Sequence, residues 1–413
     1  MVYNLKIIPG GVTAPQGFMA AGIHAGVRKN KEKKDMALLF SEVPAAAGGM
    51  FTRNVVKAAP VIWNRGLIEH ENYISALVVN SGAANACTGE QGYQNVVREA
   101  SYVADMLGIE KDSVAIASTG VIGIQLPMER IYRGIDELSQ RLSPDESSGT
   151  DAAQAIMTTD LYLKEYALSF EIKGRTVRLG GMCKGSGMIN PNLGTVLAFI
   201  TTDLNIRQEL LQKTIREDVC DTINMVSVDG EISTNDMVMI FANGKAGNEE
   251  LMEQDADYEI FKAALREMNT YFARQIAADG EGASRSFEVE VEGACDKIAA
   301  RHLAKSVVTS NLTKCAIYGA DANWGRFLCA MGGSGIEFDP YMVDIYIESS
   351  EGSLQIVHAG QAAAYDEAYA TQILTPPQVA IRIDMNMGEE SAKAWGCDLT
   401  YDFIKINADY RKH

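Results

Sequence analysis

Thr195 is the side chain of this sequence best suited to act as a nucleophile. It follows Gly194 directly in KGSGMINPNLGTVLAFITTD (184–203) and opens an apolar run that is typical of a buried strand. Glycine reaches unusual backbone conformations at little cost, and strain can be stored at a reacting peptide bond. If the Gly194–Thr195 bond is cut by an N→O acyl shift and hydrolysis, Thr195 gains a free α-amine. That amine can act as general base for its own hydroxyl. The local pattern is also that of an ordinary turn before a strand.

Three further stretches could complete such a site. AIASTGVIG ends an apolar segment in Thr119 and Gly120, where small residues let backbone N–H groups converge as an oxyanion hole requires. Lys184 lies among small residues in MCKGSGM and could reach a substrate carboxylate, while the phosphate-binding pattern GxxxxGK[ST] is absent. Glu281 stands between two glycines in DGEGAS and suits an amine-bearing ligand. Taken singly, the three are also typical of a strand-ending turn, a surface lysine and a solvated turn.

Composition and charge narrow the class of protein. The 413 residues are 47% hydrophobic and 22% charged, which is ordinary for a globular chain of two or three domains. With 54 acidic and 37 basic residues, the formal net charge of −17 repels nucleic-acid phosphates and anionic membranes. We interpret the densest basic stretch, VRKNKEKKD (27–35), as a solvated loop. The sequence therefore predicts no nucleic-acid partner and no membrane partner.

Cysteine, histidine and the N-terminus indicate the compartment. Seven scattered cysteines without a CxxC pair are typical of free thiols in a reducing compartment. Five histidines without HxxH or HExxH spacing give no zinc signature. The N-terminus lacks the apolar core of a signal peptide, and no apolar run is long enough to cross a membrane. We expect a soluble cytoplasmic protein with no metal site.

Alternating helix and strand patterns predict a layered α/β architecture. A change of pattern after residue 284 suggests a catalytic domain over 1–284, which spans the Gly194–Thr195 bond, and a smaller α/β domain over 285–413. A hairpin is predicted over 166–181, with its turn at Lys173–Gly174. The remaining predictions are helices over 93–107, 128–142, 150–157, 206–226, 258–277 and 295–308, and strands over 286–294, 343–348, 378–385 and 400–408.

Together these stretches resemble the ornithine acetyltransferase family of arginine biosynthesis, also called the glutamate N-acetyltransferase family. The resemblance covers essentially the whole chain, in long blocks that keep one order. The blocks are GGVTAPQGFMAAGIHAG (10–26), KKDMALLFSEVPAAAGGMFTRNVVKAAPV (33–61), VVNSGAANACTG, ASTGVIG, IMTTD (156–160), KGSGMINPNLGTVLAFITTD, DGEGAS, GADANWGR (319–326) and KINADYR (405–411).

The resemblance implies a mixed-sheet sandwich with outer helices, of the DmpA-like kind, and a precursor that cuts itself. The products are an α chain of 1–194 and a β chain of 195–413, which stay together and associate as α2β2. Thr195 carries the acetyl group. Position by position, Thr119 and Gly120 match the family's oxyanion-hole pair, and its substrate-binding positions are matched by Thr158, Lys184, Thr195, Glu281 and Asn407.

Three departures from the family pattern are visible. Ala83 stands where the family often has asparagine, and Ala322 replaces the proline of DPNWGR; both are interpreted as structural. Family members often end in Thr or Ser after NA-x-YR, and that residue joins the substrate site. Here Lys412 and His413 occupy the end, so that contact is not carried over.

The reaction that the resemblance implies is a ping-pong transfer of acetyl from N2-acetyl-L-ornithine to Thr195 and then to L-glutamate. No cofactor is needed, and acetyl-CoA is a conceivable second donor. Two alternatives stay open. The chain could be a self-processing amidase or aminopeptidase, with water as acceptor, or an uncleaved amino-acid-binding protein without catalysis.

Overall fold

The structure is a computed structural model that describes residues 3–190 and 196–409. The described residues divide into two compact units. The first takes those within Met1–Gly185, Asn192–Val219 and Ile232–Phe272; the second takes those within Ser186–Pro191, Cys220–Glu231 and Ala273–His413. The domain boundary predicted near residue 284 stays a prediction, because contacts between discontinuous segments do not define where an independently folding domain ends.

A mixed sheet is the framework of the first unit. Within the described residues it has nine strands in the order β1-β6-β7-β8-β10-β3-β4-β5, and β2 also pairs with β3. The long strand β3 joins two halves, because its first part pairs with β2 and β4 and its last part with β10. The bounds are β1 Lys6–Ile7, β2 Phe18–Ile23, β3 Met36–Phe51, β4 Ile74–Ala83, β5 Val114–Val121, β6 Lys164–Ile172, β7 Arg175–Lys184, β8 Leu197–Thr202 and β10 Met237–Ala242.

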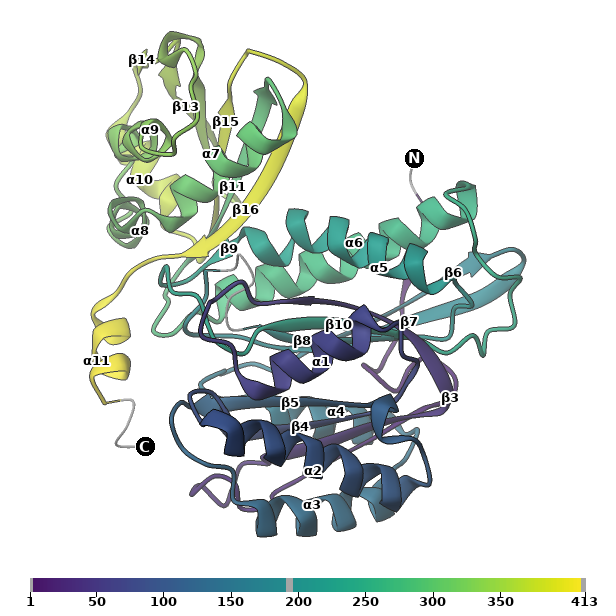
Figure 1. Ribbon diagram of the computed structural model, residues 1–413. Helices are drawn as coiled ribbons and strands as arrows, with labels where there is room; N and C mark the ends of the chain where they lie inside the picture. The colour runs from purple at the N-terminus through teal and green to yellow at the C-terminus, as the bar shows by residue number, and fades with distance from the viewer. Residues whose placement is uncertain (1–2, 191–195, 410–413) are drawn as a thin grey trace. The chain divides into compact units, whose positions relative to one another are not determined.

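Helices cover both halves of this sheet (Figure 1). Residues of α5 lie against Gly48 in β3, and residues of α6 lie against Gly181 in β7, where the missing side chains let the helices approach. On the other half, α2 packs on β5, and α3 and α4 pack on β2. The bounds are α1 Ala59–Glu69, α2 Gly89–Leu107, α3 Met128–Arg141, α4 Glu146–Ile156, α5 Gln208–Asp221 and α6 Ala256–Ala278.

The second unit has its own mixed sheet. In the described part of the chain its strand order is β14-β13-β12-β15-β11-β16-β9, and α7 packs on β11 and β16. Along β11, Phe287, Val289 and Val291 are buried, while the residues between them are half-buried. The bounds are β9 Val226–Ser227, β11 Ser286–Ala294, β12 Asp344–Ser349, β13 Gly352–His358, β14 Gln361–Ala362, β15 Gln378–Asp384, β16 Glu390–Cys397, α7 Lys297–Thr309, α8 Asn311–Tyr318, α9 Trp324–Gly332, α10 Glu367–Leu374 and α11 Tyr401–Asp409.

The predicted α/β class, with mixed sheets and outer helices, is confirmed. The predicted hairpin is confirmed as β6 and β7, and its turn residues Lys173 and Gly174 have φ values of 47° and 72°, as a two-residue type I′ turn requires. The predicted helices correspond to α2 to α7, and three of the four predicted strands to β11, β12 and β15.

The strand predicted over 400–408 is wrong, because this segment forms the helix α11. The Thr400 hydroxyl accepts a hydrogen bond from the Phe403 backbone N–H at 3.2 Å, which is an N-cap contact. Nine residues are too few for apolar spacing to separate the two periods. A helix satisfies its own backbone hydrogen bonds, whereas a strand here would need a neighbouring strand.

Three observations bear on the expected class of protein. No helix in the described ranges is long and apolar enough to span a membrane. Each of the seven cysteines lies in a described segment and is free. Within residues 3–190 and 196–409, no group of three or more His, Cys, Asp or Glu side chains is arranged to hold a metal ion.

Glu99 is an unusual buried group in the first unit. It lies on the inner face of α2 with no exposed surface, and among the described residues neither carboxyl oxygen has a hydrogen-bond partner. Burial raises the pKa of Glu99 to about 8 from an ordinary value of 4.5. Between these two pH values the folded chain keeps a proton that the unfolded chain has released. The free energy of unfolding therefore falls as pH rises from about 4.5 to about 8.

We predict that Glu99→Gln removes this pH dependence. The variant should match the wild type near pH 5 and exceed it at pH 9, by a few kcal/mol at about 1.4 kcal/mol per pKa unit. Thermal unfolding midpoints between pH 5 and pH 9 measure the difference. Glu90→Gln, an exposed position on the same helix, is the control and should follow the wild type. Parallel pH profiles for Glu99→Gln and wild type would contradict the assignment.

Candidate active site

Thr119 and Gly120 lie near the end of β5, paired with the end of β4. The register places Thr119 opposite Ser81 and Gly120 opposite Gly82. Gly120 has a φ of +126°, and a Cβ built on it would lie 2.4 Å from the Gly82 carbonyl carbon. No other residue fits this close approach. The strand pair thus fixes the positions of the two residues predicted to form an oxyanion hole.

Asn235 holds the ends of both strands, and the sequence did not single it out. Its buried amide donates hydrogen bonds to the carbonyl oxygens of Ala84 at 2.6 Å and Ser118 at 2.8 Å. The Thr234 hydroxyl donates to the side-chain amide oxygen of Asn235, Oδ1, at 2.6 Å. A buried amide with its hydrogen bonds made on both sides is a rigid bridge. It fixes the backbone directly before Thr119.

Lys184 ends β7 and is brought to Thr119 by the fold. Its side chain is only 2% exposed, and its Nζ lies 3.5 Å from the Thr119 Oγ1. Burial lowers the pKa of Lys184, and the negative charge of Asp160 opposes that shift. The alternative interpretation of Lys184 as an ordinary surface lysine is therefore wrong.

Asp160 connects the Thr158 segment to the Lys184 segment. Its buried carboxylate accepts hydrogen bonds from the N–H of Thr158 at 2.9 Å and the N–H of Gly185 at 2.8 Å. It also pairs with the Lys164 ammonium at 2.9 Å, with both side chains buried. Burial by itself would raise the pKa of Asp160, but the charges of Lys184 and Lys164 and these hydrogen bonds hold it well below its usual range. Asp160 belongs to the quoted block IMTTD, yet the sequence analysis assigned no role to it.

The predicted nucleophile Thr195 and its neighbour Gly194 lie outside the described residues. Val196 is the first described residue after them, and it is anchored on both sides. Its N–H donates to the Asp236 carboxyl at 3.1 Å, and its carbonyl accepts from the Met237 N–H at 3.0 Å. Asp236 is buried, and burial raises its pKa well above the usual value. Val196, which directly precedes β8, is therefore fixed on both sides.

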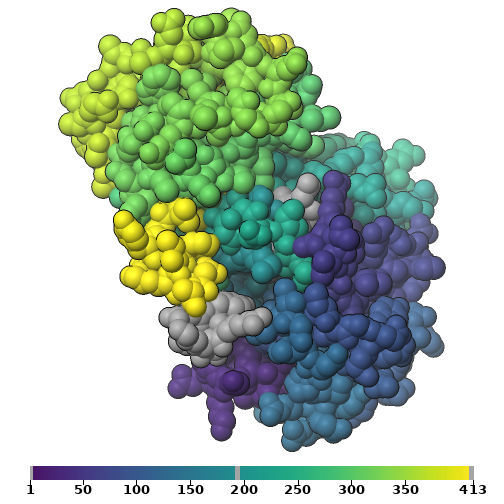
Figure 2. Space-filling view, turned by 60° about the vertical axis from the view of Figure 1, so that its left-hand side comes forward, coloured from purple at the N-terminus to yellow at the C-terminus, as the bar shows by residue number. Residues whose placement is uncertain are grey.

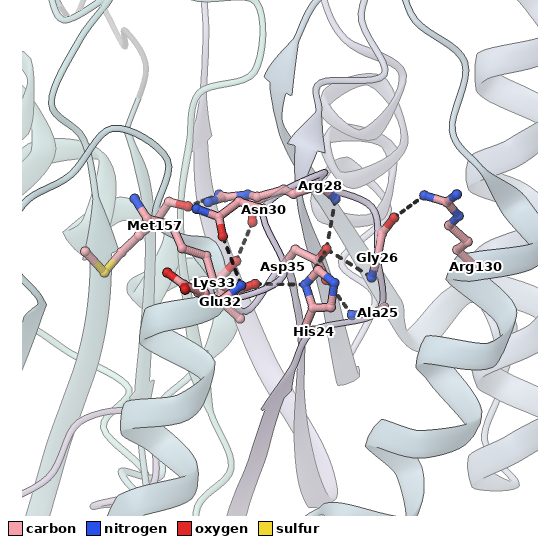
Figure 3. Close-up of polar contacts among 12 residues, drawn as sticks. His24, Ala25, Gly26, Arg28, Asn30, Glu32, Lys33, Asp35, Arg130 and Met157 are labelled. Atoms are coloured by element: carbon pink, nitrogen blue, oxygen red, sulfur yellow. Dashed lines mark hydrogen bonds and ion pairs between the residues drawn. The ribbon is translucent and has the colours of Figure 1, made fainter. Parts of the chain in front are cut away.

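The loop before β3 is built around the buried carboxylate of Asp35 (Figure 3). This carboxylate accepts hydrogen bonds from the backbone N–H groups of Ala25 at 2.6 Å, Gly26 at 3.1 Å and Arg28 at 2.9 Å. The interpretation of 27–35 as a solvated loop holds for its exposed middle. It is wrong for half-buried Arg28 and for Asp35.

Arg28 is a further cation that the fold brings to this region. Its guanidinium donates to the carbonyl oxygen of Met157, next to Thr158 (Figure 3). A Cβ on Gly82 would lie 2.9 Å from the Arg28 Cγ. Burial lowers the pKa of Lys184 most, and the positive charge of Arg28 is one of the nearby charges that lower it further. The only sequence signal for Arg28 was the basic stretch, in which nothing set it apart from its exposed neighbours.

Glu281 and Asn407 meet in the second unit. Glu281 is 8% exposed, and its Oε2 accepts a hydrogen bond from the Asn407 side-chain amide at 2.9 Å. A Cβ on Gly187 would lie 2.3 Å from the Glu281 carboxyl carbon, so only glycine leaves room for this carboxylate. The interpretation of Glu281 as a solvated turn residue is therefore wrong.

Thr400 ties the helix that carries Asn407 to the loop that carries Glu281. Its hydroxyl donates to the Gly282 carbonyl at 2.6 Å while it caps α11. A Cβ on Gly282 would lie 2.4 Å from the Phe403 nitrogen, so the first turn of α11 packs directly against the Gly282 backbone. Most α11 side chains are exposed, and Figure 2 shows the helix in yellow at the surface. Few contacts besides these hold α11 in place.

The structure therefore groups the predicted site residues within each unit. Thr119, Gly120, Lys184 and, through Asp160, Thr158 lie together in the first unit. Glu281 and Asn407 lie together in the second unit. Their catalytic and substrate-binding roles stay predictions.

We predict that Gly120→Ala lowers the free energy of unfolding by at least about 2 kcal/mol, because its Cβ would collide with the Gly82 backbone and the positive φ disfavours any side chain. Thermal unfolding measures the loss. Gly66→Ala in α1 is the control, since a Cβ there meets nothing within 4 Å and alanine favours the helix. Equal stability of Gly120→Ala and wild type would show that the close approach does not contribute to the free energy of unfolding.

We also predict that Thr400→Val loosens α11, because valine keeps the shape of threonine and loses both hydrogen bonds. Amide hydrogen exchange over residues 403–407 should accelerate about tenfold, as expected when about 1.4 kcal/mol of capping free energy is lost. Thr400→Ser retains the hydroxyl and should exchange like the wild type. Unchanged exchange in Thr400→Val would show that other contacts hold the helix.

Comparison with known proteins gives the family. The ArgJ family model matches residues 19–412. The arginine biosynthesis bifunctional protein ArgJ of Symbiobacterium thermophilum is 49% identical over 408 residues, which cover 98% of this chain and 100% of that protein. The protein of the same name from Thermotoga neapolitana is 47% identical over 398 residues, covering 96% and 99%. A crystal structure of the Bacillus halodurans arginine biosynthesis bifunctional protein is similar at 43% identity and a TM-score of 0.49, covering 51% of this chain and 98% of that one. The resemblance found in the sequence is thus confirmed, and this chain belongs to the ArgJ family.

Proposed function

We propose that this chain is an acetyltransferase of arginine biosynthesis that moves acetyl from N2-acetyl-L-ornithine to L-glutamate through an acetyl-Thr195 ester. Membership of the ArgJ family supports the pathway. The observation that carries the proposal is the position of the buried Lys184 ammonium, 3.5 Å from the Thr119 hydroxyl at the fixed ends of β4 and β5. A cation and an oxyanion-hole pair at one rigid point suit acyl transfer to and from amino acids.

Self-cleavage comes first in the proposed sequence. The Thr195 hydroxyl attacks the Gly194 carbonyl, the amide becomes an ester, and water hydrolyses the ester. The products are an α chain that ends in a Gly194 carboxylate and a β chain that begins with the Thr195 amine. Val196, the residue after Thr195 in the sequence, is held on both sides, and this anchoring supports the step.

Acetyl transfer follows in two half-reactions. The Thr195 hydroxyl attacks the acetyl carbonyl of the donor while the Thr195 amine takes its proton. The Thr119 hydroxyl and the Gly120 N–H stabilise the oxyanion, and the proton passes to the departing ornithine amine. The glutamate amine then attacks the ester and leaves as N-acetylglutamate, with Thr195 restored.

The charged residues bind the substrates in this proposal. Lys184 binds the substrate carboxylate, with Thr158 beside it. Glu281 and Asn407 bind an amine, since a buried carboxylate favours a cationic ligand. The reaction needs no cofactor. The word bifunctional in the names of the relatives supports acetyl-CoA as a second donor to the same threonine. We further propose that the two chains remain associated as α2β2 in the cytoplasm.

We predict that Thr195→Ala abolishes both self-cleavage and acetyl transfer, because it removes the nucleophile for each. Intact mass of the purified protein gives one species for the variant and two for the wild type, one of them beginning at Thr195. Thr195→Ser keeps a hydroxyl and should retain part of both activities. N-acetylglutamate formation from N2-acetylornithine and glutamate measures transfer.

Two results would contradict the proposal. A cleaved or active Thr195→Ala protein would exclude Thr195 as the nucleophile. Release of free acetate by the wild type in the presence of glutamate, without N-acetylglutamate, would indicate a hydrolase.

A further inference from the structure

Asp160 is buried in the first unit and makes a contact with each of three segments. Its Oδ2 accepts the N–H of Thr158 at 2.9 Å, and its Oδ1 accepts the N–H of Gly185 at 2.8 Å. The same Oδ1 accepts the Lys164 ammonium at 2.9 Å. The two oxygens of one carboxylate therefore set the distance between the Thr158 segment and the end of β7, where Lys184 lies.

The Lys184 ammonium is buried among charges of both signs. Burial lowers its pKa most. The negative charges of Asp160 and Asp236 raise it, and the positive charges of Lys164 and Arg28 lower it further. Of these charged groups, Asp160 has the largest influence on Lys184, so its carboxylate contributes most to keeping this lysine protonated.

We propose that Asp160 is a positioning residue of the acetyl-transfer reaction, which aligns Thr158 with Lys184 and keeps the Lys184 ammonium charged for a substrate carboxylate. Asp160 touches no substrate in this proposal and acts through the two other residues. The inference rests on the proposed function, because it assumes that Thr158 and Lys184 bind substrate. It adds a residue to which neither the sequence blocks nor the family match assigned a role.

The competing explanation is that Asp160 and Lys164 form a buried ion pair that only stabilises the fold. Breaking either side of such a pair leaves an uncompensated buried charge and costs stability. That explanation predicts similar losses of stability for both partners and no change in the pH dependence of kcat/KM. The proposal instead predicts opposite changes, because Asp160 and Lys164 carry opposite charges toward Lys184.

The test compares Asp160→Asn with Lys164→Gln in the full-length protein. Asparagine can keep the Oδ1 contacts, but it removes the negative charge and turns an NH2 group toward the Thr158 N–H. The alkaline limb of kcat/KM should therefore move to lower pH by about one unit or more, with KM for the donor raised about tenfold and kcat affected less. Lys164→Gln should move the same limb to higher pH.

A second measurement does not depend on activity. Lysine labelled with 13C at Cε reports the titration of Lys184 by NMR, with its resonance assigned from Lys184→Arg. Its midpoint should fall in Asp160→Asn and rise in Lys164→Gln. If Asp160→Asn does not fold, Arg28→Gln replaces it. In that variant the Lys184 midpoint should rise, as in Lys164→Gln, because a positive neighbour has been removed.

The outcomes separate the two proposals. Wild-type protein without acetyl transfer would overturn the proposed function, while the NMR titration still tests the influence of Asp160 on Lys184. Active wild-type protein with an unmoved alkaline limb and an unmoved Lys184 midpoint in all variants would overturn the role of Asp160. Shifts in the same direction for Asp160→Asn and Lys164→Gln would do so as well.

Discussion

A buried lysine ammonium is the constraint on which the first unit depends. Lys184 is buried at the end of a central strand, where burial disfavours its charge. The fold compensates with Asp160, which is itself buried and held by Lys164 and two backbone N–H groups. Removing Asp160 would take away the negative charge that compensates the buried ammonium groups of Lys164 and Lys184. The group is therefore rigid, which suits the carboxylate-binding role that we propose for Lys184.

Close backbone approach is the second device that positions the site. Gly82 and Gly120 bring the ends of β4 and β5 together more closely than any side chain allows, and Asn235 bridges the carbonyls beside them. Gly187 plays the same part for Glu281 in the second unit. In each case a glycine permits a close approach that a side chain would block. The glycine-rich blocks of the sequence thus have a steric cause.

The predicted site residues of the two units differ in how deeply they are buried. Thr119 and Lys184 lie on strands of the nine-stranded sheet and are almost fully buried. Asn407 lies on α11, an exposed helix tied down by the Thr400 hydroxyl, the Gly282 contact and Asn407 itself. An element with few buried contacts opens at low free energy. The Asn407 side of the predicted site is therefore expected to open more easily than the surroundings of Lys184.

The sequence by itself determined the α/β class, most helices and strands, the hairpin turn at Lys173–Gly174 and, through long ordered blocks, the family. These are set by periodicity, by turn chemistry and by residues that stand together in the chain. Tertiary structure alone decided that Asp160, Asn235 and Arg28 lie beside Thr119, Thr158 and Lys184, because those contacts join segments far apart in sequence. It also decided that 400–408 is a helix, because nine residues fit both periods and only the cap on Thr400 and the contact with Gly282 distinguish them. Tertiary structure also decided whether a charged side chain is solvated or buried. Arg28 and Lys184 look like surface residues from their sequence neighbours, and only the packing of distant strands and loops buries Lys184 and half-buries Arg28.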